Sequence, residues 1–546
     1  MGKSRSGNRI FGRFEMKKFD PISLKILWDR LVAISDELVL SLVRTSFSMN
    51  VREGYDLSCM LFDSKARLLT QGSYSVPSFT GTAPHTIAHM LREFPPETLK
   101  SGDVIMTNDP WMGTGHLFDI NVMRPVFKGS RLVGFTMSVT HLPDIGGRGM
   151  SSDCTEVYHE GLRLPVCKLR EDGILNELLI DVIRTNVRVP EQTIGDLMAN
   201  VACNEVGGRA LLEFMDEYGL DEIESLADAI NLHSEMAMRE KLGEISDGTY
   251  ENKIQIEGPG HPICLSTSVS IRGGEVDIDF EGTDGPVRAS INVPFCYTNA
   301  QSLYVIKCLT IPGLPNNEGS MRSVNVRAPD NCILNAQPPW PTGGRHSVGH
   351  FVVPLLMGAL APALPEKVQA DAAMMNVFSV QGRHRNGEEI SSLFFLAGGL
   401  GAMHGLDGRA VTPAPSNMTV VPTEIWENRT SMTIEKRAIL ENTGGAGKWR
   451  GGPGQEVIFR NDTQNLLEFA LMGQRTEFAA KGLVGGEDGS LRTYLVNGIE
   501  VDPKARVVLM PGDRITMREA GGGGYGDQRE REPDALEKDR EMGYVK

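Results

Sequence analysis

The C-terminal part of the chain is where the sequence restricts the fold most. Beyond Asn417, short apolar stretches alternate with glycine-rich segments, of which 443–454 and 521–526 are the longest. Short apolar runs bounded by turn residues are typical of β-strands. We therefore predict a mostly β region, with strands near 431–440, 456–460, 466–471, 492–496 and 506–510.

The preceding sequence mixes helical and strand patterns. Asp20-Pro21 is a helix-start signal, and apolar residues then recur at helical spacing up to about Ser46. Further strands are predicted at 56–69, 103–108, 122–127, 131–140 and 252–280, and further helices at 82–94, 176–241, 298–310 and 350–364. The predicted fold class is α+β, with multi-layer mixed α/β N-terminal and central regions and a mostly β C-terminal region.

The chain has 546 residues, which is too long for one hydrophobic core. Changes of pattern suggest five parts. They are a disordered basic tail at 1–19, an N-terminal α/β domain at 20–242, a central α+β domain at 243–415, a mostly β C-terminal domain at 416–528 and a polar tail at 529–546.

Composition indicates which partners and which cellular compartment to expect. A net charge of −15 argues against a nucleic-acid partner, which requires a basic surface. The longest apolar run, 351–364, is too short to span a bilayer, and the basic start lacks the apolar core of a secretory signal. The eight cysteines form no Cys-x-x-Cys pair. Reduced thiols and a cytoplasmic location are the expectation.

Two His-x-x-Asp pairs, His116/Asp119 and His141/Asp144, lie 25 residues apart beside glycines and prolines that interrupt regular structure. Imidazole and carboxylate together are ligands for a hydrolytic or Lewis-acid divalent metal. We predict His116, Asp119 and His141 as metal ligands in the N-terminal domain. Asp56 is the predicted fourth ligand, because a carboxylate at the mouth of an apolar strand is unfavourable without a cation. Asp144 would bind the metal or orient an imidazole. The alternative is that these residues only cap turns.

Two other segments invite a functional interpretation. Arg345-His346 and His350 precede an apolar helix, where they could ligate a metal but more often cap a helix or line a cleft. The glycine-rich segment at 443–449 fails as a phosphate loop because Trp449 follows the lysine. Gly521–Gly524 predict a tight loop with unusual backbone angles rather than a phosphate cradle. The chain therefore shows no nucleotide site of its own.

With these motifs in place, the chain resembles the hydantoinase B/oxoprolinase family from about Asp20 to Asp527. The resemblance rests on NVREGYDLSC at 50–59, NDP at 108–110 with GHLFD at 115–119, and HLPDIGG at 141–147. It continues in YHEGLR at 158–163, GGAGKWRGGPGQ at 444–455 and the glycine-rich end at 511–527.

The resemblance implies a division of labour between two subunits. An A-type subunit with an actin-like ATPase domain phosphorylates the amide or carbonyl oxygen of the substrate. The B-type chain supplies the metal site, and in lactam-hydrolysing relatives the ligands match Asp56, His116, Asp119 and His141. Many relatives carry a histidine where this chain has Phe79. Ketone-carboxylase chains of the same kind are generally longer, which favours a hydrolase.

The leading hypothesis is an ATP-dependent hydrolase that opens a cyclic amide such as a hydantoin, 5-oxoproline or another lactam, working in a hetero-oligomer. The metal would be zinc or manganese, or alternatively iron, while ATP and Mg²⁺ would bind the partner. The metal would lower the pKa of a bound water, and Asp144 would act as general base or fix a ligand imidazole. The alternatives are a ketone-carboxylase subunit and a non-catalytic scaffold with a structural metal.

Overall fold

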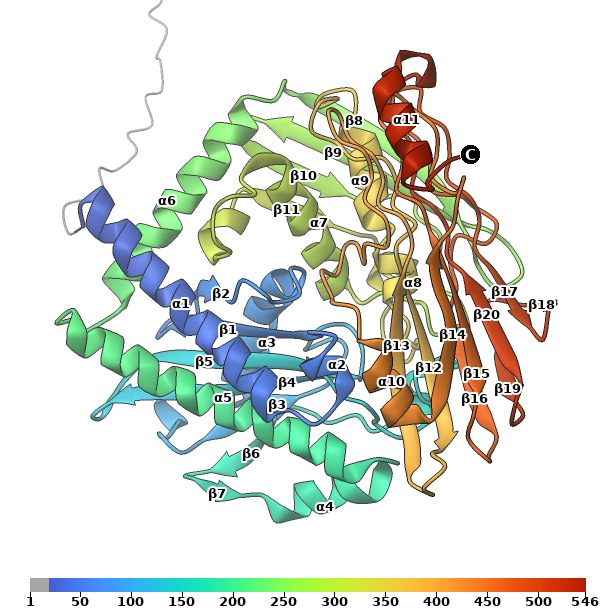
Figure 1. Ribbon diagram of the computed structural model, residues 1–546. Helices are drawn as coiled ribbons and strands as arrows, with labels where there is room; N and C mark the ends of the chain where they lie inside the picture. The colour runs from blue at the N-terminus through green and yellow to red at the C-terminus, as the bar shows by residue number, and fades with distance from the viewer. Residues whose placement is uncertain (1–18) are drawn as a thin grey trace, which may run out of the picture.

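A computed structural model describes residues 19–546, so the tail predicted at 1–19 lies almost entirely outside the described residues. The fold is α+β as predicted, with mixed layers in the first two thirds of the chain and strands concentrated towards the C-terminus (Figure 1). Among the helices of the described part, none has the length and apolar character that crossing a bilayer requires.

A seven-stranded antiparallel sheet forms the centre of the N-terminal part of the chain. Its strand order is β2-β1-β5-β4-β3-β6-β7. The strands are β1 (Leu57–Asp63), β2 (Leu68–Gln71), β3 (Val104–Thr107), β4 (Asp119–Lys128), β5 (Arg131–His141), β6 (Cys167–Glu171) and β7 (Ile174–Leu175). The hairpin of β4 and β5 pairs Asp119 with His141. Two of the predicted ligands are thereby neighbours at one end of the sheet.

Helices cover both faces of this sheet. The long helices α1 (Pro21–Thr45) and α5 (Pro190–Glu217) pack on one face, and α3 (Phe79–Glu93) packs on the other. Alternation along β1 accounts for this, because Leu57 and Leu61 point to α1 and α5 while Met60 points to α3. The helix start predicted at Asp20 is confirmed, since its carboxylate accepts hydrogen bonds from two main-chain N–H groups of the first turn. The remaining helices here are α2 (Met49–Arg52), α4 (Glu177–Asn186) and α6 (Glu224–Gly243).

The central part packs helices against a four-stranded sheet of order β11-β10-β9-β8. The strands are β8 (Gly248–Ile256), β9 (Ile263–Arg272), β10 (Glu275–Asp279) and β11 (Val324–Arg327), and the helices are α7 (Phe295–Thr310), α8 (His346–Gly349) and α9 (Val352–Leu360). Helix α7 also contacts α3, which joins this part to the seven-stranded sheet. The apolar run at 351–364 contains α9, which ends at Leu360 and is buried in the core, as its lack of charge predicts.

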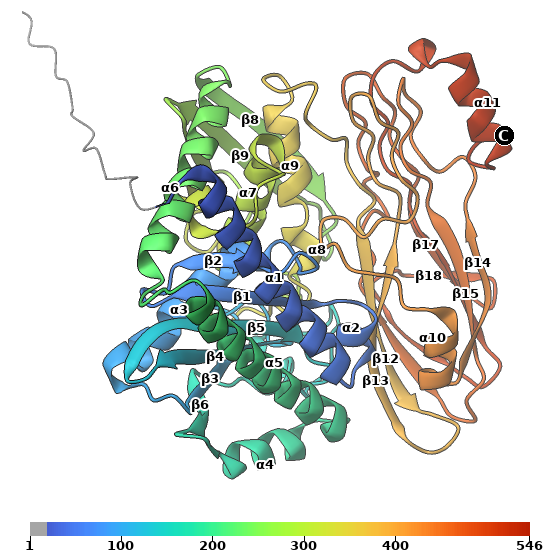
Figure 2. The ribbon, with the colours of Figure 1, turned by 60° about the vertical axis from the view of Figure 1, so that its left-hand side comes forward.

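Two stacked sheets form the C-terminal part, on the right of Figure 2. One has the order β13-β12-β16-β19 and the other β14-β15-β20-β17-β18. They are built from β12 (Met375–Arg383), β13 (Glu389–Ala397), β14 (Met432–Ile439), β15 (Gln455–Asn461), β16 (Leu467–Leu471), β17 (Thr493–Val496), β18 (Ile499–Val501), β19 (Arg506–Leu509) and β20 (Arg514–Arg518). Aromatic side chains of both sheets, including Phe378 and Phe459, share one core.

The strands β12 and β13 were not predicted, and they begin about 40 residues before the expected onset of β-structure at Asn417. Both strands are buried on their two faces, and apolar and polar residues are mixed irregularly along them (MNVFSVQGR and EISSLFFLA). Such runs lack the alternation that distinguishes a strand from a buried helix. Helices α10 (Thr423–Thr430) and α11 (Pro533–Glu541) were also missed, as were the short helices α2 and α8; α11 lies in the predicted polar tail.

The glycine-rich segments allow backbones to lie directly against each other. A Cβ atom on Gly451 would overlap the carbonyl oxygen of Gly522, and one on Gly524 would overlap that of Ala446. The φ angles of Gly521–Gly524 are not in the positive range, so the expectation of unusual backbone angles was wrong. These glycines are needed for close approach between chain segments.

Candidate metal centre

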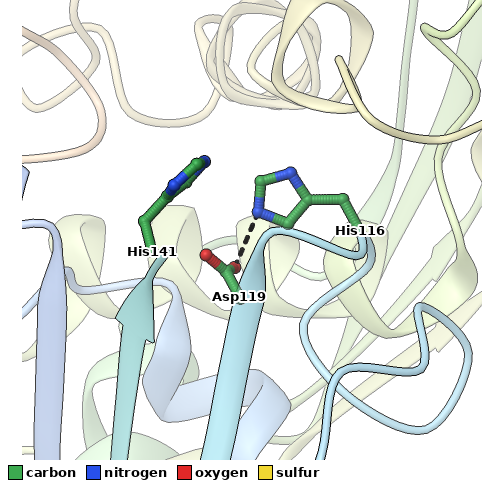
Figure 3. A group of neighbouring side chains, drawn as sticks. All are labelled: His116, Asp119 and His141. Carbon is green, nitrogen blue, oxygen red and sulfur yellow. Dashed lines mark ion pairs between the residues drawn. The ribbon is translucent and has the colours of Figure 1, made fainter. Parts of the chain in front are cut away.

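Three predicted ligands lie together at one end of the seven-stranded sheet. Asp119 begins β4, His141 ends β5, and His116 lies in the loop that leads into β4 (Figure 3). One ligand atom from each residue lies within 4.8 Å of the other two. All three side chains are at most 3% exposed. The hairpin register and the short His116–Asp119 spacing are sufficient to bring them together.

Main-chain carbonyl groups fix the orientation of both imidazoles. The Nδ1 atom of His116 lies 3.0 Å from the carbonyl oxygen of Gly343, and that of His141 lies 2.9 Å from the carbonyl oxygen of Leu142. A carbonyl oxygen only accepts, so each Nδ1 carries the proton and each Nε2 keeps its lone pair. Neither Nε2 atom has a hydrogen-bond partner among the described residues, and the same holds for Oδ1 of Asp119. Three buried atoms with free lone pairs thus face one region.

Asp119 is held as an anion. Its Oδ2 accepts hydrogen bonds from Thr114 Oγ1 at 2.6 Å and from Arg345 Nη2 at 2.8 Å, and it lies 3.0 Å from Nε2 of His116. Burial alone would raise the pKa of Asp119, but the positive charge of the Arg345 guanidinium holds it below its ordinary value. Asp119 is therefore ready to bind a cation through its free Oδ1.

Both imidazoles are held neutral. Burial lowers the pKa of His141 to about 3, and the neighbouring His116 adds to this effect. Burial and the nearby Arg345 also lower the pKa of His116. Neutral imidazole is the form that binds a metal, so the two histidines need lose no proton at neutral pH.

Asp56 lies just before β1 and borders the same site. Its carbonyl oxygen accepts the N–H of His141 at 3.2 Å, and its carboxylate is 8% exposed. Burial raises the pKa of Asp56 to about 8, and the charge of the nearby Asp119 adds to the rise. The group of three side chains within 4.8 Å of one another does not include Asp56. Its role as the fourth ligand stays a prediction.

Asp144 is engaged with another partner. Its Oδ1 accepts hydrogen bonds from Arg188 Nη1 at 2.9 Å and from the N–H of Gly146 at 3.2 Å, and its Oδ2 accepts from the N–H of Arg188. It joins the turn after β5 to the segment between α4 and α5. Phe79, where relatives often carry histidine, begins α3 and packs into the apolar core beneath the sheet.

Arg345 reaches the site from a distant part of the sequence. The segment with Arg345, His346 and His350 was expected to cap a helix or line a cleft, but the contact of Arg345 with Asp119 was not predicted. Arg345 donates to Asp119 and, at 2.6 Å, to the carbonyl oxygen of Thr114, and its guanidinium stacks on Tyr297 with 4.1 Å to the ring centre. His350, which we weighed as a metal ligand, lies with Nε2 3.0 Å from the Tyr297 hydroxyl instead. The one available signal was the Pro-Thr-Gly-Gly turn before Arg345.

Glu160 stabilises the segment that contains Gly343. This buried carboxylate accepts the N–H of Gly343 at 2.7 Å and the hydroxyl of Ser290, while the carbonyl group of Gly343 receives Nδ1–H of His116. Burial raises the pKa of Glu160 to about 7. Glu160 therefore holds the residue whose carbonyl group orients His116, although it touches no predicted ligand itself.

We expect Glu160→Ala to weaken metal binding by about 10- to 100-fold, the usual effect of losing a group that orients a ligand. Glu160→Gln should lose much less, because its amide oxygen still accepts the Gly343 N–H. The measurement is metal affinity by competition with a chelator. Equal affinities in wild type and Glu160→Ala would show that Gly343 needs no such support.

The arrangement of these side chains defines a class of protein. Two neutral imidazoles and one carboxylate, all buried and with free lone pairs, fit a divalent transition metal. Neither hydrogen bonding nor packing within the described residues accounts for those three free atoms. The chain is thus an α+β protein with a candidate mononuclear metal centre.

Comparison with known proteins places this class in a family. The family model for hydantoinase B/oxoprolinase matches residues 20–528, and the chain belongs to that family. The caprolactamase subunit beta of Pseudomonas jessenii is 29% identical over 541 residues, which cover 94% of this chain and 92% of the relative. The crystal structure of the ATP-dependent caprolactamase from the same organism superposes with a TM-score of 0.88, at 26% identity, over 97% of this chain and 95% of that one. A nucleotide-free acetone carboxylase shares the fold with a TM-score of 0.86 at 20% identity, covering 97% of this chain and 79% of that one.

Proposed function

We propose that the chain is the metal-binding subunit of an ATP-dependent enzyme that hydrolyses the C–N bond of a cyclic amide. The observation that carries this proposal is the buried group of His116, Asp119 and His141, whose ligand atoms converge within 4.8 Å. The family membership and the caprolactamase likeness support a lactam, hydantoin or oxoproline ring as the substrate class.

The metal would be held by His116, Asp119 and His141, with Asp56 as the fourth ligand. A bound zinc, manganese or iron ion supplies Lewis acidity towards water or an amide oxygen. The chain's own residues prepare the site for it. Carbonyl groups hold the imidazoles in one tautomer, and Arg345 keeps Asp119 ionised.

An A-type ATPase subunit is the proposed partner. An unactivated amide is a poor electrophile, and phosphorylation of its oxygen would lower the barrier to attack on the amide carbon and so to ring opening. The glycine-rich segments at 443–454 and 521–526 pack against each other, so their backbones are not open to the phosphates of ATP. The ATP and Mg²⁺ would therefore bind the partner in a hetero-oligomer, and the activated amide would reach the metal centre of this chain.

Asp144 stays a predicted general base or positioning carboxylate. Its hydrogen bonds to Arg188 and Gly146 support the positioning role. These hydrogen bonds fix the turn that follows His141. They thereby also fix the carbonyl group of Leu142, which orients the imidazole of His141.

Metal affinity is expected to rise with pH. The carboxyl group of Asp56 has a pKa of about 8 without metal, so below pH 8 an incoming cation must displace one proton. The logarithm of the affinity should increase by about one per pH unit up to pH 8 and level off above it. The histidines are already neutral and add no slope. Calorimetric titration between pH 6 and 9 measures this, and Asp56→Asn should abolish the slope. An unchanged slope in that variant would assign the proton to another group.

The functional test combines the purified chain with its A-type partner. With both subunits and ATP, ring opening of caprolactam, hydantoin or 5-oxoproline is expected, whereas the isolated chain should turn over none of them. Turnover by the isolated chain would overturn the two-subunit proposal. Bicarbonate-dependent consumption of acetone would favour the carboxylase alternative, for which the structural likeness is one of fold alone.

A further inference from the structure

A second pair of histidines lies on α3, outside the site described above. His85 and His89 are one helical turn apart, and their Nε2 atoms approach to 3.1 Å. His85 is exposed and His89 is half-buried. Burial, followed by the charges of His85 and Arg92, lowers the pKa of His89, so this imidazole is neutral at pH 7 and available as a ligand.

A third acceptor lies beside this pair. The carbonyl oxygen of Trp111 is 2.9 Å from Nε2 of His85. A neutral imidazole nitrogen either carries a proton or offers a lone pair, so Nε2 of His85 cannot both donate to Trp111 and accept from His89. If Nε2 of His85 carries the proton, that one proton has to serve the Trp111 oxygen and the His89 nitrogen together. A single cation would satisfy all three atoms at once.

We propose that His85, His89 and the carbonyl oxygen of Trp111 bind a divalent transition-metal cation at a second site. Two imidazole nitrogens at tetrahedral positions, about 2.05 Å from zinc, lie about 3.3 Å apart, close to the distance seen here. A pair of histidines four residues apart on a helix presents both rings on one face. Because the site borders solvent, water would complete the coordination.

The second site joins α3 to the loop that carries a ligand of the first. Trp111 begins the stretch that leads to His116, and its indole Nε1 donates to the carbonyl oxygen of Ala336 at 2.8 Å. A cation held by His85, His89 and Trp111 would attach the Trp111 end of this loop to α3. Occupancy is therefore expected to restrict the segment between Trp111 and His116.

The test measures binding of Ni²⁺ or Zn²⁺ by calorimetry in a His116→Ala background, where the first site is disabled. One equivalent is expected to bind in this background. Adding His85→Gln or His89→Gln should weaken that binding at least tenfold, whereas adding His233→Gln should leave it unchanged. His233 is a matched control, because it is also an exposed helical histidine.

Melting temperatures separate a lost site from a lost fold. With saturating Ni²⁺, the His116→Ala chain should melt at a higher temperature than without it, and the His85→Gln derivative should lose that increase while its metal-free melting temperature stays the same. Equal Ni²⁺ affinity in the His85, His89 and His233 derivatives would overturn the proposal. Absence of binding at millimolar Ni²⁺ in the His116→Ala chain would overturn it as well. Neither outcome bears on the first site.

Discussion

His116→Ala is expected to release the metal and to reduce ring opening by the two-subunit complex about 10³-fold or more. The substitution removes one of two imidazoles, and a Lewis-acid metal contributes several kcal/mol of transition-state stabilisation, of which about 4 kcal/mol corresponds to 10³ in rate. The measurements are metal content by mass spectrometry and turnover with the A-type partner present.

The melting temperature decides what the metal is for. If the metal serves catalysis, metal-free His116→Ala should melt close to metal-free wild type, and the complex with the partner should still assemble. Loss of folding or assembly in step with the metal would instead support the scaffold alternative, since a structural metal contributes folding energy. His261→Ala, at an exposed loop position, is the matched control. Retained metal and full turnover in His116→Ala would contradict the assignment of the site.

Arg345→Met is expected to lower the free energy of unfolding of the metal-free chain by about 3–5 kcal/mol. The guanidinium is 5% exposed and is an ion-pair partner of the buried Asp119. Removing it leaves a carboxylate in the interior without a compensating charge. A bound metal would supply that charge, so the deficit should shrink when the protein is saturated with metal. Urea unfolding with and without metal measures both values.

A double variant tests the reason for this loss. Asp119→Asn/Arg345→Met removes both charges and should be more stable without metal than Arg345→Met alone, because no buried anion remains. A double variant that is equally or less stable would place the effect in lost packing against Tyr297 rather than in charge.

The part of the site that could be foreseen is the part encoded locally. His116, Asp119 and His141 lie within 26 consecutive positions, and the β4–β5 hairpin, with a register shift between Val126 and Phe127, places Asp119 beside His141. The sequence pattern predicted both strands of this hairpin, and the structure brings the three side chains together. Asp144 shares the same motif, yet its carboxylate turns to Arg188, a contact that spacing along the chain does not encode.

The contacts that complete the site were beyond sequence reasoning because they are distant along the chain. Gly343 and Arg345 approach His116 and Asp119 only through the packing of the central helices. The same limit applied to β12 and β13, whose two faces pack against parts of the chain that are distant in sequence and whose polar and apolar residues do not alternate regularly. The glycine-rich segments were recognised, but their purpose, direct contact between backbones, became visible only in three dimensions.

The long separation of Asp119 and Arg345 along the chain determines when the site is completed during synthesis. Asp119 precedes Arg345 by 226 residues, which a ribosome adds in about 11 to 45 s at 5–20 residues per second. After His141 has been added, the growing chain contains both imidazoles and the carboxylate, but neither the arginine nor the Gly343 carbonyl group that complete their surroundings. We therefore expect the proposed metal centre to reach its final surroundings only after Arg345 has been synthesised.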